Sequence, residues 1–180
     1  QKKLYGKNFY HLGPKRDNAL FSGFENNKKN IENADFILCT GFLDNNEDSL
    51  SYYKNLLKKY IKLKMVCTNP DLAVHRGAKQ EYCAGTLAEI FKNLGGEVIY
   101  FGKPYPEIYN FCIKKNETVL VIGDNIRTDI KGANSMNFDS LFVTNGIHKN
   151  EFLNLQYQDY DKILNKYEVK TNYYQKKLIW

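Results

Sequence analysis

The sequence predicts an α/β protein with a mostly parallel sheet. Apolar runs rich in β-branched or aromatic residues alternate along the chain with segments whose apolar residues recur every three or four positions. This alternation indicates strand–helix–strand units, in which the helix returns the chain so that the next strand runs parallel to the last. The composition agrees, because 43% of the 180 residues are hydrophobic, which is enough to bury a core.

Apolar runs mark the expected strands at residues 35–40, 64–68, 97–101, 118–122 and 140–144. Helical spacing covers residues 48–62 and 83–94, a segment that starts at Pro106, and residues 127–136. Gly95 and Gly96 supply a stop signal after the second of these helices. In the Tyr- and Lys-rich tail, residues 150–180, we expect one or two short helices and a last strand at 177–180.

The best candidate for a domain boundary lies near residues 100–102. A strand is expected to end there, and a segment with different chemistry begins. We therefore predict one α/β domain over residues 1–100 and a second over residues 101–180.

Charge and composition narrow the range of partners. The net charge of +6 comes from lysines that are dispersed along the chain with acids between them. We therefore expect a solvated surface or a general attraction for small anions, and no nucleic-acid partner. No apolar run approaches the roughly 20 residues of a membrane helix, so we expect no membrane partner and a cytoplasmic location. The cysteines form no CxxC pair, and we expect them to be buried, reduced thiols.

Two carboxylates follow the run at 118–122. Asp124 comes after a single glycine, Gly123, and Asp129 follows in the next turn of chain. Ligands of open parallel sheets bind beyond the carboxyl ends of the strands, and paired carboxylates there suit Mg²⁺. The alternative is that Asp124 or Asn125 caps the helix and that Asp129 is an exposed acid of its first turn.

A lysine follows the preceding strand in a similar way. Gly102 ends the apolar run at 97–101, and Lys103 stands before the helix that begins at Pro106. At this edge of the sheet a lysine could neutralise a phosphoryl group or a carboxylate nucleophile. By itself, a Gly-Lys-Pro sequence is also compatible with an ordinary turn and a solvated lysine.

These segments resemble a known family. "GKPYPEIY" (102–109) is similar to the third motif of the haloacid-dehalogenase-like phosphohydrolases, and "VIGDNIRTDIKGA" (121–133) to the fourth. Within the family the resemblance is to the class IIA, NagD-like group, because residues 66–91, "VCTNPDLAVHRGAKQEYCAGTLAEIF", are similar to part of that group's cap. The resemblance extends roughly over residues 33–147. It implies the C-terminal half of a Rossmann-like core at 101–180, preceded by an α/β cap of the C2 type at 1–100.

The resemblance also implies roles for single residues. Asp124 matches the Mg²⁺-binding acid, Asp129 the second carboxylate that supports the water shell of the metal, and Lys103 the lysine that screens charge between phosphate and nucleophile. Motif positions that support them are Gly102, Gly123 and Asn125.

Three residues of the cap-like segment could face the substrate. They are Asn69, Asp71 and His75, which follow the expected strand at 64–68. The alternatives are an ordinary "TNPD" turn and a surface histidine.

The first two motifs of the family are not recognised in this chain. They comprise an aspartate nucleophile and a general acid after an apolar strand, then a strand-ending Ser or Thr. The candidate acids Asp44, Asp48, Asp159 and Asp161 stand in polar stretches. We expect that the chain begins inside the cap. Three explanations are open: the chain is the C-terminal part of a longer enzyme, one component of a split protein, or a degenerate, non-catalytic relative. The first residue is Gln1 and not Met, which favours the first explanation.

The function implied by the resemblance is Mg²⁺-dependent hydrolysis of a small phosphate monoester through an aspartyl-phosphate intermediate. Sugar phosphates, nucleotides and cofactor phosphates are the expected substrates of the parent enzyme, and the chain alone is expected to be inactive. Its partners would be a second copy of the chain or the missing N-terminal segment. The alternative from another class is a binding module without chemistry. A phosphoacceptor domain of the response-regulator type fits poorly, because Lys103 precedes the acid pair.

Overall fold

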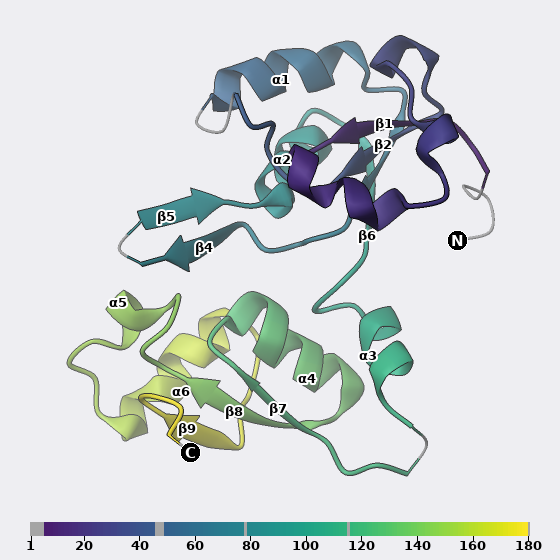
Figure 1. Cartoon of the computed structure of the whole chain (residues 1–180). Helices are drawn as coiled ribbons and strands as arrows, with labels where there is room; N and C mark the ends of the chain where they lie inside the picture. Colours follow the sequence, from purple (N-terminus) through teal and green to yellow (C-terminus); the bar gives the residue numbers. More distant parts are fainter. Residues whose placement is uncertain (1–5, 46–48, 78, 115, 180) are drawn as a thin grey trace. The chain divides into compact units, whose positions relative to one another are not determined.

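The chain divides into two compact units, Gln1–Phe101 (unit 1) and Gly102–Trp180 (unit 2) (Figure 1). The computed structural model describes residues 6–45, 49–77, 79–114 and 116–179, apart from the side chains of His75 and Arg76. The prediction of an α/β fold with parallel sheets is confirmed in both units.

Unit 1 contains a parallel sheet in the order β1-β2-β3-β6 and a separate antiparallel hairpin, β4–β5. Its elements in chain order are β1 (Phe9–Leu12), three short 3₁₀ helices η1 (Lys15–Phe21), η2 (Glu25–Asn27) and η3 (Ile31–Asn33), β2 (Phe36–Cys39), α1 (Leu50–Lys59), β3 (Lys64–Cys67), β4 (Ala73–Arg76), β5 (Lys79–Tyr82), α2 (Ala84–Asn93) and β6 (Glu97–Tyr100).

Helices α1 and α2 cover one face of the four-stranded sheet. Their apolar residues recur with helical spacing, so that they meet the sheet along one side of each helix. The largest fully buried side chains of this core are Leu12, Ile37, Tyr53, Leu57, Met65, Leu87 and Phe91. The hydroxyl of Tyr53 also accepts a hydrogen bond from the backbone N–H of Leu43 at 2.8 Å, which fixes the loop after β2.

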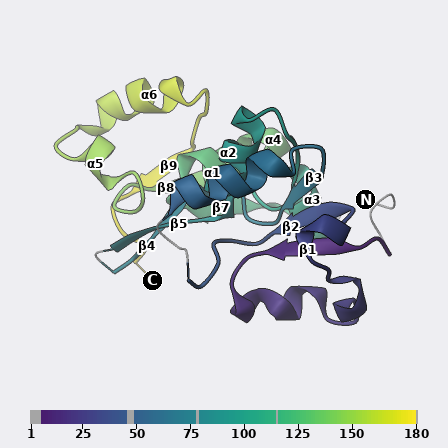
Figure 2. The same ribbon diagram turned by 90° about the horizontal axis from the view of Figure 1, so that it is seen from above.

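The 3₁₀ segment between β1 and β2 lies on the opposite face (Figure 2). Phe21 of η1 packs edge-on against Phe9 of β1, with ring centroids 5.1 Å apart, and the same cluster includes Phe36 and Val66. Both faces of the sheet are therefore buried, as is usual for parallel sheets.

Strand β1 and the β4–β5 hairpin were not predicted. The correctly predicted strands β2, β3 and β6 are also four residues long, but β1, β4 and β5 contain polar residues (FYHL, AVHR and KQEY), so none of these three produces an uninterrupted apolar run. Their pairing depends on neighbours in space: Phe9 of β1 aligns with Phe36 of β2.

Unit 2 contains a parallel sheet in the order β7-β8-β9. Phe142 of the central strand is fully buried against the helices, in a cluster with Ile126, Ile130, Phe152, Tyr160, Leu164 and Val169. The elements are α3 (Pro106–Cys112), β7 (Leu120–Gly123), the π-helical turn η4 (Ile126–Ile130), α4 (Lys131–Met136), β8 (Asp139–Val143), α5 (Lys149–Phe152), α6 (Tyr157–Lys166) and β9 (Tyr173–Gln175).

The expected strand at 177–180 is wrong in position. The last strand is β9, whose residue Tyr174 aligns with Phe142 of β8. Asn172 sets this register, because its side chain accepts a hydrogen bond from the backbone N–H of Ser140 at 3.0 Å and donates one to Asp139 at 2.8 Å. Trp180 lies outside the described residues.

None of the described candidate acids outside the fourth motif directly follows a strand, as the acids of the first motif would. Asp159 and Asp161 lie on helix α6, and Asp44 lies in a turn some way after β2. Asp48 lies outside the described residues.

The cysteines meet the expectation of burial only in part. Cys39, Cys67 and Cys83 are free and buried, but Cys112 is exposed, although its apolar neighbours in the sequence indicated burial. Of the helices that the structure describes, none combines the length and apolarity needed to cross a membrane.

Candidate active site

Asp124 stands directly after β7, at the carboxyl edge of the unit 2 sheet. Its Oδ2 accepts a hydrogen bond from the backbone N–H of Ile147, at 3.0 Å, in the loop that follows β8. The neighbouring Gly146 leaves room for the carboxylate, since a Cβ on Gly146 would stand 2.0 Å from Oδ2 of Asp124. The loops after two adjacent parallel strands therefore fix the orientation of this acid.

Asn125 begins the turn that follows. Its side-chain oxygen accepts a hydrogen bond from the backbone N–H of Arg127 at 3.0 Å, which is the N-cap arrangement that the sequence left open. Its backbone carbonyl accepts from both Asp129 at 2.8 Å and Ile130 at 3.2 Å. The hydrogen bond from Ile130, which spans five residues, closes the π-helical turn, and π-helical turns occur often at functional sites.

Asp129 is buried by this turn, with 8% of its side chain exposed. It is therefore not the exposed first-turn acid of the alternative interpretation. Its Oδ2 accepts a hydrogen bond from the backbone N–H of Asn125 at 3.1 Å. A Cβ on Gly123 would stand 2.3 Å from the carboxyl group of Asp129, so only glycine allows β7 to approach this side chain so closely.

Lys103 forms an ion pair with Oδ1 of Asp129. The two residues are 26 positions apart in the sequence, and the structure brings the third-motif lysine onto the fourth-motif acid. Gly102, with φ of 98°, makes the turn that presents Lys103, and a residue with a side chain would be strained in that conformation. The Lys103 side chain is half-exposed, so it also faces solvent at the edge of the sheet.

Tyr109, on α3, was not predicted as part of this region. Its hydroxyl is buried and has no hydrogen-bond partner among the residues that the structure describes. Burial, followed by the charge of Asp129, raises the pKa of Tyr109 to about 12. A Cβ on Gly132 of α4 would stand 1.9 Å from this hydroxyl, which shows how closely α3 and α4 approach. The signal for it in the sequence was its place at the end of the segment that resembles the third motif, on the helix predicted from Pro106.

The three candidate residues of the cap-like segment lie in unit 1. Asn69 and Asp71 form a turn, in which the side-chain oxygen of Asn69 accepts a hydrogen bond from the backbone N–H of Asp71 at 3.1 Å. The backbone carbonyl of Asp71 accepts from Gly85 at 3.1 Å, which anchors the turn on helix α2. His75 lies on β4, aligned with Gln80, and its side chain lies outside the described part of the chain. A role of these residues in substrate binding stays a prediction.

The residues of unit 2 fit part of a magnesium site. Oδ1 of Asp124 accepts no hydrogen bond from the residues that the structure describes, and oxygen is the ligand type that Mg²⁺ prefers. Both oxygens of Asp129 are engaged, by Lys103 and Asn125, which suits a role in orienting the surroundings of a metal more than direct ligation. Within the described residues, no three His, Cys, Asp or Glu side chains cluster closely enough to hold a metal by themselves.

Comparison with known proteins places these residues in a family. A family model described as HAD-hydrolase-like matches residues 100–168, the segment that contains Lys103, Asp124 and Asp129. Over these residues the chain matches the haloacid-dehalogenase-like (HAD-like) family, as the sequence motifs indicated. The resemblance to the class IIA, NagD-like group is confirmed as well.

Three relatives indicate how far the likeness extends. Ribonucleotide monophosphatase NagD of Escherichia coli K12 is 31% identical over 88 residues, which are 47% of this chain and 34% of NagD. The crystal structure of a haloacid dehalogenase-like hydrolase from Brucella suis 1330 is 30% identical with a TM-score of 0.74, over 79% of this chain and 59% of that one. The p-nitrophenyl phosphatase of Archaeoglobus fulgidus matches 97% of this chain and 66% of its own with a TM-score of 0.66, and at 14% identity it shows the fold alone. The chain thus spans about a third of the NagD sequence and under two thirds of these solved structures.

Proposed function

We propose that this chain carries the metal-binding part of a Mg²⁺-dependent phosphatase that hydrolyses a small phosphate monoester. The observation that carries the proposal is the arrangement in unit 2, where Asp124 is oriented by the loop after β8 and Lys103 is paired with the buried Asp129. The match to the HAD-like family supports it, as do the phosphatases among the relatives.

Each residue of the arrangement has a distinct part in the proposed reaction. Oδ1 of Asp124 would hold the metal, because Oδ2 is already occupied by the N–H of Ile147. Asp129 keeps Lys103 at the edge of the sheet, where its ammonium group would neutralise charge on the phosphoryl group. When bound, Mg²⁺ supplies Lewis-acid stabilisation of the phosphoryl oxygens.

The nucleophile of the proposed reaction comes from a segment other than the residues described. Formation of an aspartyl phosphate requires a carboxylate presented together with the metal. The triplet Asp159–Tyr160–Asp161 has the spacing of the family's first motif, but it lies on helix α6 and Tyr160 is buried. We therefore expect no turnover by the 180 residues alone.

Unit 1 is proposed to be the cap of this enzyme. A cap of this size would close the site to macromolecules, so the proposed substrates are sugar phosphates, nucleotides or cofactor phosphates. The turn of Asn69 and Asp71, together with His75, would supply contacts to the organic part of the substrate. A second copy of the chain or an N-terminal segment of the parent protein is the proposed partner.

The proposal is tested with the full-length parent protein and a generic phosphomonoester, with and without Mg²⁺. We expect turnover only with Mg²⁺, and loss of turnover to the background rate in Asp124→Asn. Glu168→Gln, which removes an exposed carboxylate of the same unit outside both motif segments, serves as the matched control and should retain activity. If Asp124→Asn is as active as the parent, the metal assignment is wrong.

Two further measurements, hydrolysis by the 180 residues alone and Mg²⁺ binding by the parent protein, distinguish an enzyme from a binding module. Hydrolysis by the 180 residues alone would contradict the proposed origin of the nucleophile. A parent protein that binds Mg²⁺ but hydrolyses no phosphomonoester would instead favour a binding module without chemistry.

A further inference from the structure

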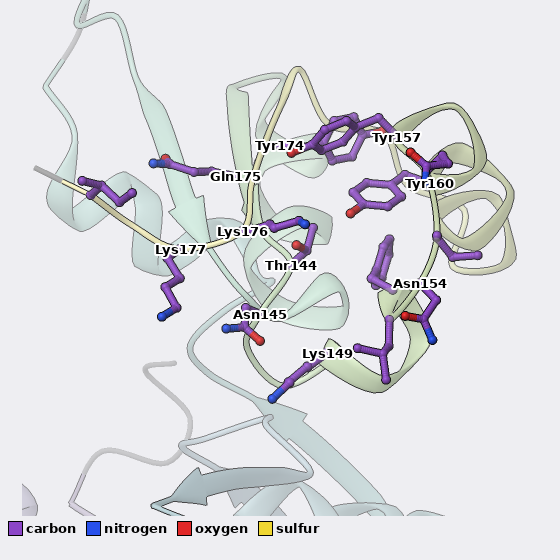
Figure 3. A pocket seen from close by; sticks show the side chains of 15 residues that line it. Thr144, Asn145, Lys149, Asn154, Tyr157, Tyr160, Tyr174, Gln175, Lys176 and Lys177 are labelled. Carbon is purple, nitrogen blue, oxygen red and sulfur yellow. The ribbon is translucent and has the colours of Figure 1, made fainter.

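Unit 2 contains a cavity of about 650 Å³ that the proposed phosphatase reaction does not use. The cavity lies beside the carboxyl ends of β8 and β9 and is closed on the other side by α5, α6 and the loop between them (Figure 3). Thr144 follows β8 and Lys176 follows β9, so both stand at the edge where ligands of parallel sheets bind. Lys103, Asp124 and Asp129 do not line this cavity.

The charged side chains around the cavity are all positive. Lys149, Lys176 and Lys177 line it, and the described lining residues include no carboxylate. The acids nearby have partners of their own: Asp161 accepts a hydrogen bond from the hydroxyl of Tyr174 at 2.6 Å, and Glu151 accepts from Tyr167 at 2.8 Å. The positive charge is thus not neutralised inside the cavity, which favours an anion.

Two buried residues present their hydroxyl groups to the same space. Tyr160 is 2% exposed, and its hydroxyl points into the cavity on the side of Thr144 and Lys176 (Figure 3). Thr144 is 5% exposed. Neither side chain makes a hydrogen bond with any residue that the structure describes. Both residues are buried while their hydroxyl oxygens stay accessible, so the two hydroxyls open onto the cavity and can donate to a ligand or to solvent there.

The wall opposite the lysines is aromatic. Tyr160 packs edge-on against Phe152, with ring centroids 4.9 Å apart, and against Tyr174, with centroids 5.1 Å apart. Tyr157 lies at the rim and is mostly exposed. Aromatic surfaces of this kind attract a planar ring by offset stacking or edge-to-face contact.

We infer that this cavity binds a small organic anion that carries one aromatic ring. The hydroxyls of Tyr160 and Thr144 and the ammonium group of Lys176 donate to the anionic group, which accepts only, as a phosphate or carboxylate does. The ring of the ligand rests against the tyrosines. This site is separate from the proposed metal site, and its existence does not depend on phosphatase activity.

Phenylphosphonate is a suitable probe, because it combines a ring with a dianion and has no ester bond to hydrolyse. Binding is measured by titration calorimetry on the chain in the presence of EDTA. We expect phenylphosphonate to bind more tightly than methylphosphonate, which lacks the ring, and benzyl alcohol, which lacks the charge. Equal affinity for phenylphosphonate and methylphosphonate would overturn the aromatic part of the inference, and an absence of phenylphosphonate binding would overturn all of it.

Variants locate the bound probe. Tyr160→Phe removes a hydroxyl without a protein partner, so it should leave the melting temperature unchanged and weaken binding about tenfold. Lys176→Gln should weaken binding by a similar factor. The matched controls are Tyr173→Phe and Lys166→Gln, exposed residues of unit 2 outside the cavity, which should bind the probe as the parent chain does.

A last variant distinguishes this site from the metal site. Asp124→Asn should bind the probe unchanged. If Asp124→Asn abolishes binding while Tyr160→Phe does not affect it, the probe occupies the proposed phosphatase site and the inference is wrong.

Discussion

Unit 1 buries both faces of its parallel sheet, whereas unit 2 leaves apolar side chains of its first strand exposed. In unit 1, α1 and α2 cover one face and the 3₁₀ segment with Phe21 covers the other. In unit 2, β7 pairs only with β8 among the described strands, and Leu120 and Ile122 of β7 are 48% and 41% exposed. Parallel strands are normally covered on both faces, so unit 2 has an uncovered surface along β7.

The candidate site residues lie in unit 2, beside the strand whose apolar side chains are exposed. Asp124 follows β7, and Lys103 and the buried Asp129 stand beside it. The proposed Mg²⁺ site would need further oxygen ligands, which can come from a segment that pairs with the open edge of β7. Unit 1 is thus packed on both faces around β1, β2 and β3, with an apolar cavity of about 620 Å³ beside Leu38, Ile99 and Phe101. Unit 2 is packed around Phe142 and exposed along β7.

The largest effect is expected from a deletion in the closed core of unit 1. Phe91→Ala removes a fully buried ring and should lower the free energy of unfolding by about 3–5 kcal/mol. Phe111→Ala, the same change at a side chain of unit 2 that is 82% exposed, should stay within about 0.5 kcal/mol. Urea unfolding measures both. Similar losses in the two variants would contradict the difference in packing between the two units.

An intermediate effect is expected at the contact between α3 and α4. Gly132→Ala places a Cβ against the hydroxyl of Tyr109 and should destabilise the chain by about 1–3 kcal/mol. The double variant Gly132→Ala/Tyr109→Phe should recover part of that loss, because it removes the oxygen that the new methyl group meets. Urea unfolding of the single and double variants tests the contact, and an absence of recovery would rule it out.

Alkaline pH should have a smaller effect through the same tyrosine. The pKa of Tyr109 is raised from 10.0 to about 12, so the folded protein holds the proton more tightly than the unfolded chain does. Its contribution, on the order of 1 kcal/mol, is complete below pH 10 and is lost as the pH rises from 10 through 12. Because other tyrosines also titrate there, the measurement is the difference in unfolding free energy between the parent chain and Tyr109→Phe. A difference that is constant from pH 9 to pH 12 would contradict the assignment.

The smallest effect on stability is expected from substitutions on β7, which should instead change the self-association of the chain. Leu120→Lys and Ile122→Lys should each change the free energy of unfolding by less than about 0.5 kcal/mol, since both side chains are already largely exposed. The two together should reduce self-association, because charge on an open edge opposes strand pairing. Sedimentation velocity measures this change. Leu20→Lys, at an exposed position of unit 1, is the control and should leave association unaltered.

Much of the fold could be predicted from local pattern. The strands at 35–40, 64–68 and 97–101 correspond to β2, β3 and β6, and the helices at 48–62 and 83–94 contain α1 and α2. These elements carry extended apolar runs or helical periodicity, which neighbouring residues alone determine. Strand β1, the hairpin and the position of β9 were missed or misplaced, because their sequences mix polar with apolar residues and their strand character comes from pairing.

By itself, the sequence determined the alternation of strands and helices, and it placed Lys103 after β6 and Asp124 and Asp129 after β7. It also determined the match of residues 100–168 to the HAD-like family model, because such motifs consist of residues close together in the chain. Only the tertiary structure decided that Asp129 is buried and paired with Lys103, that the loop after β8 orients Asp124, and that Tyr109 packs beside them. The physical reason is that these contacts join residues more than 20 positions apart. They depend on strand register and on the space left by glycines, for which no local signal exists.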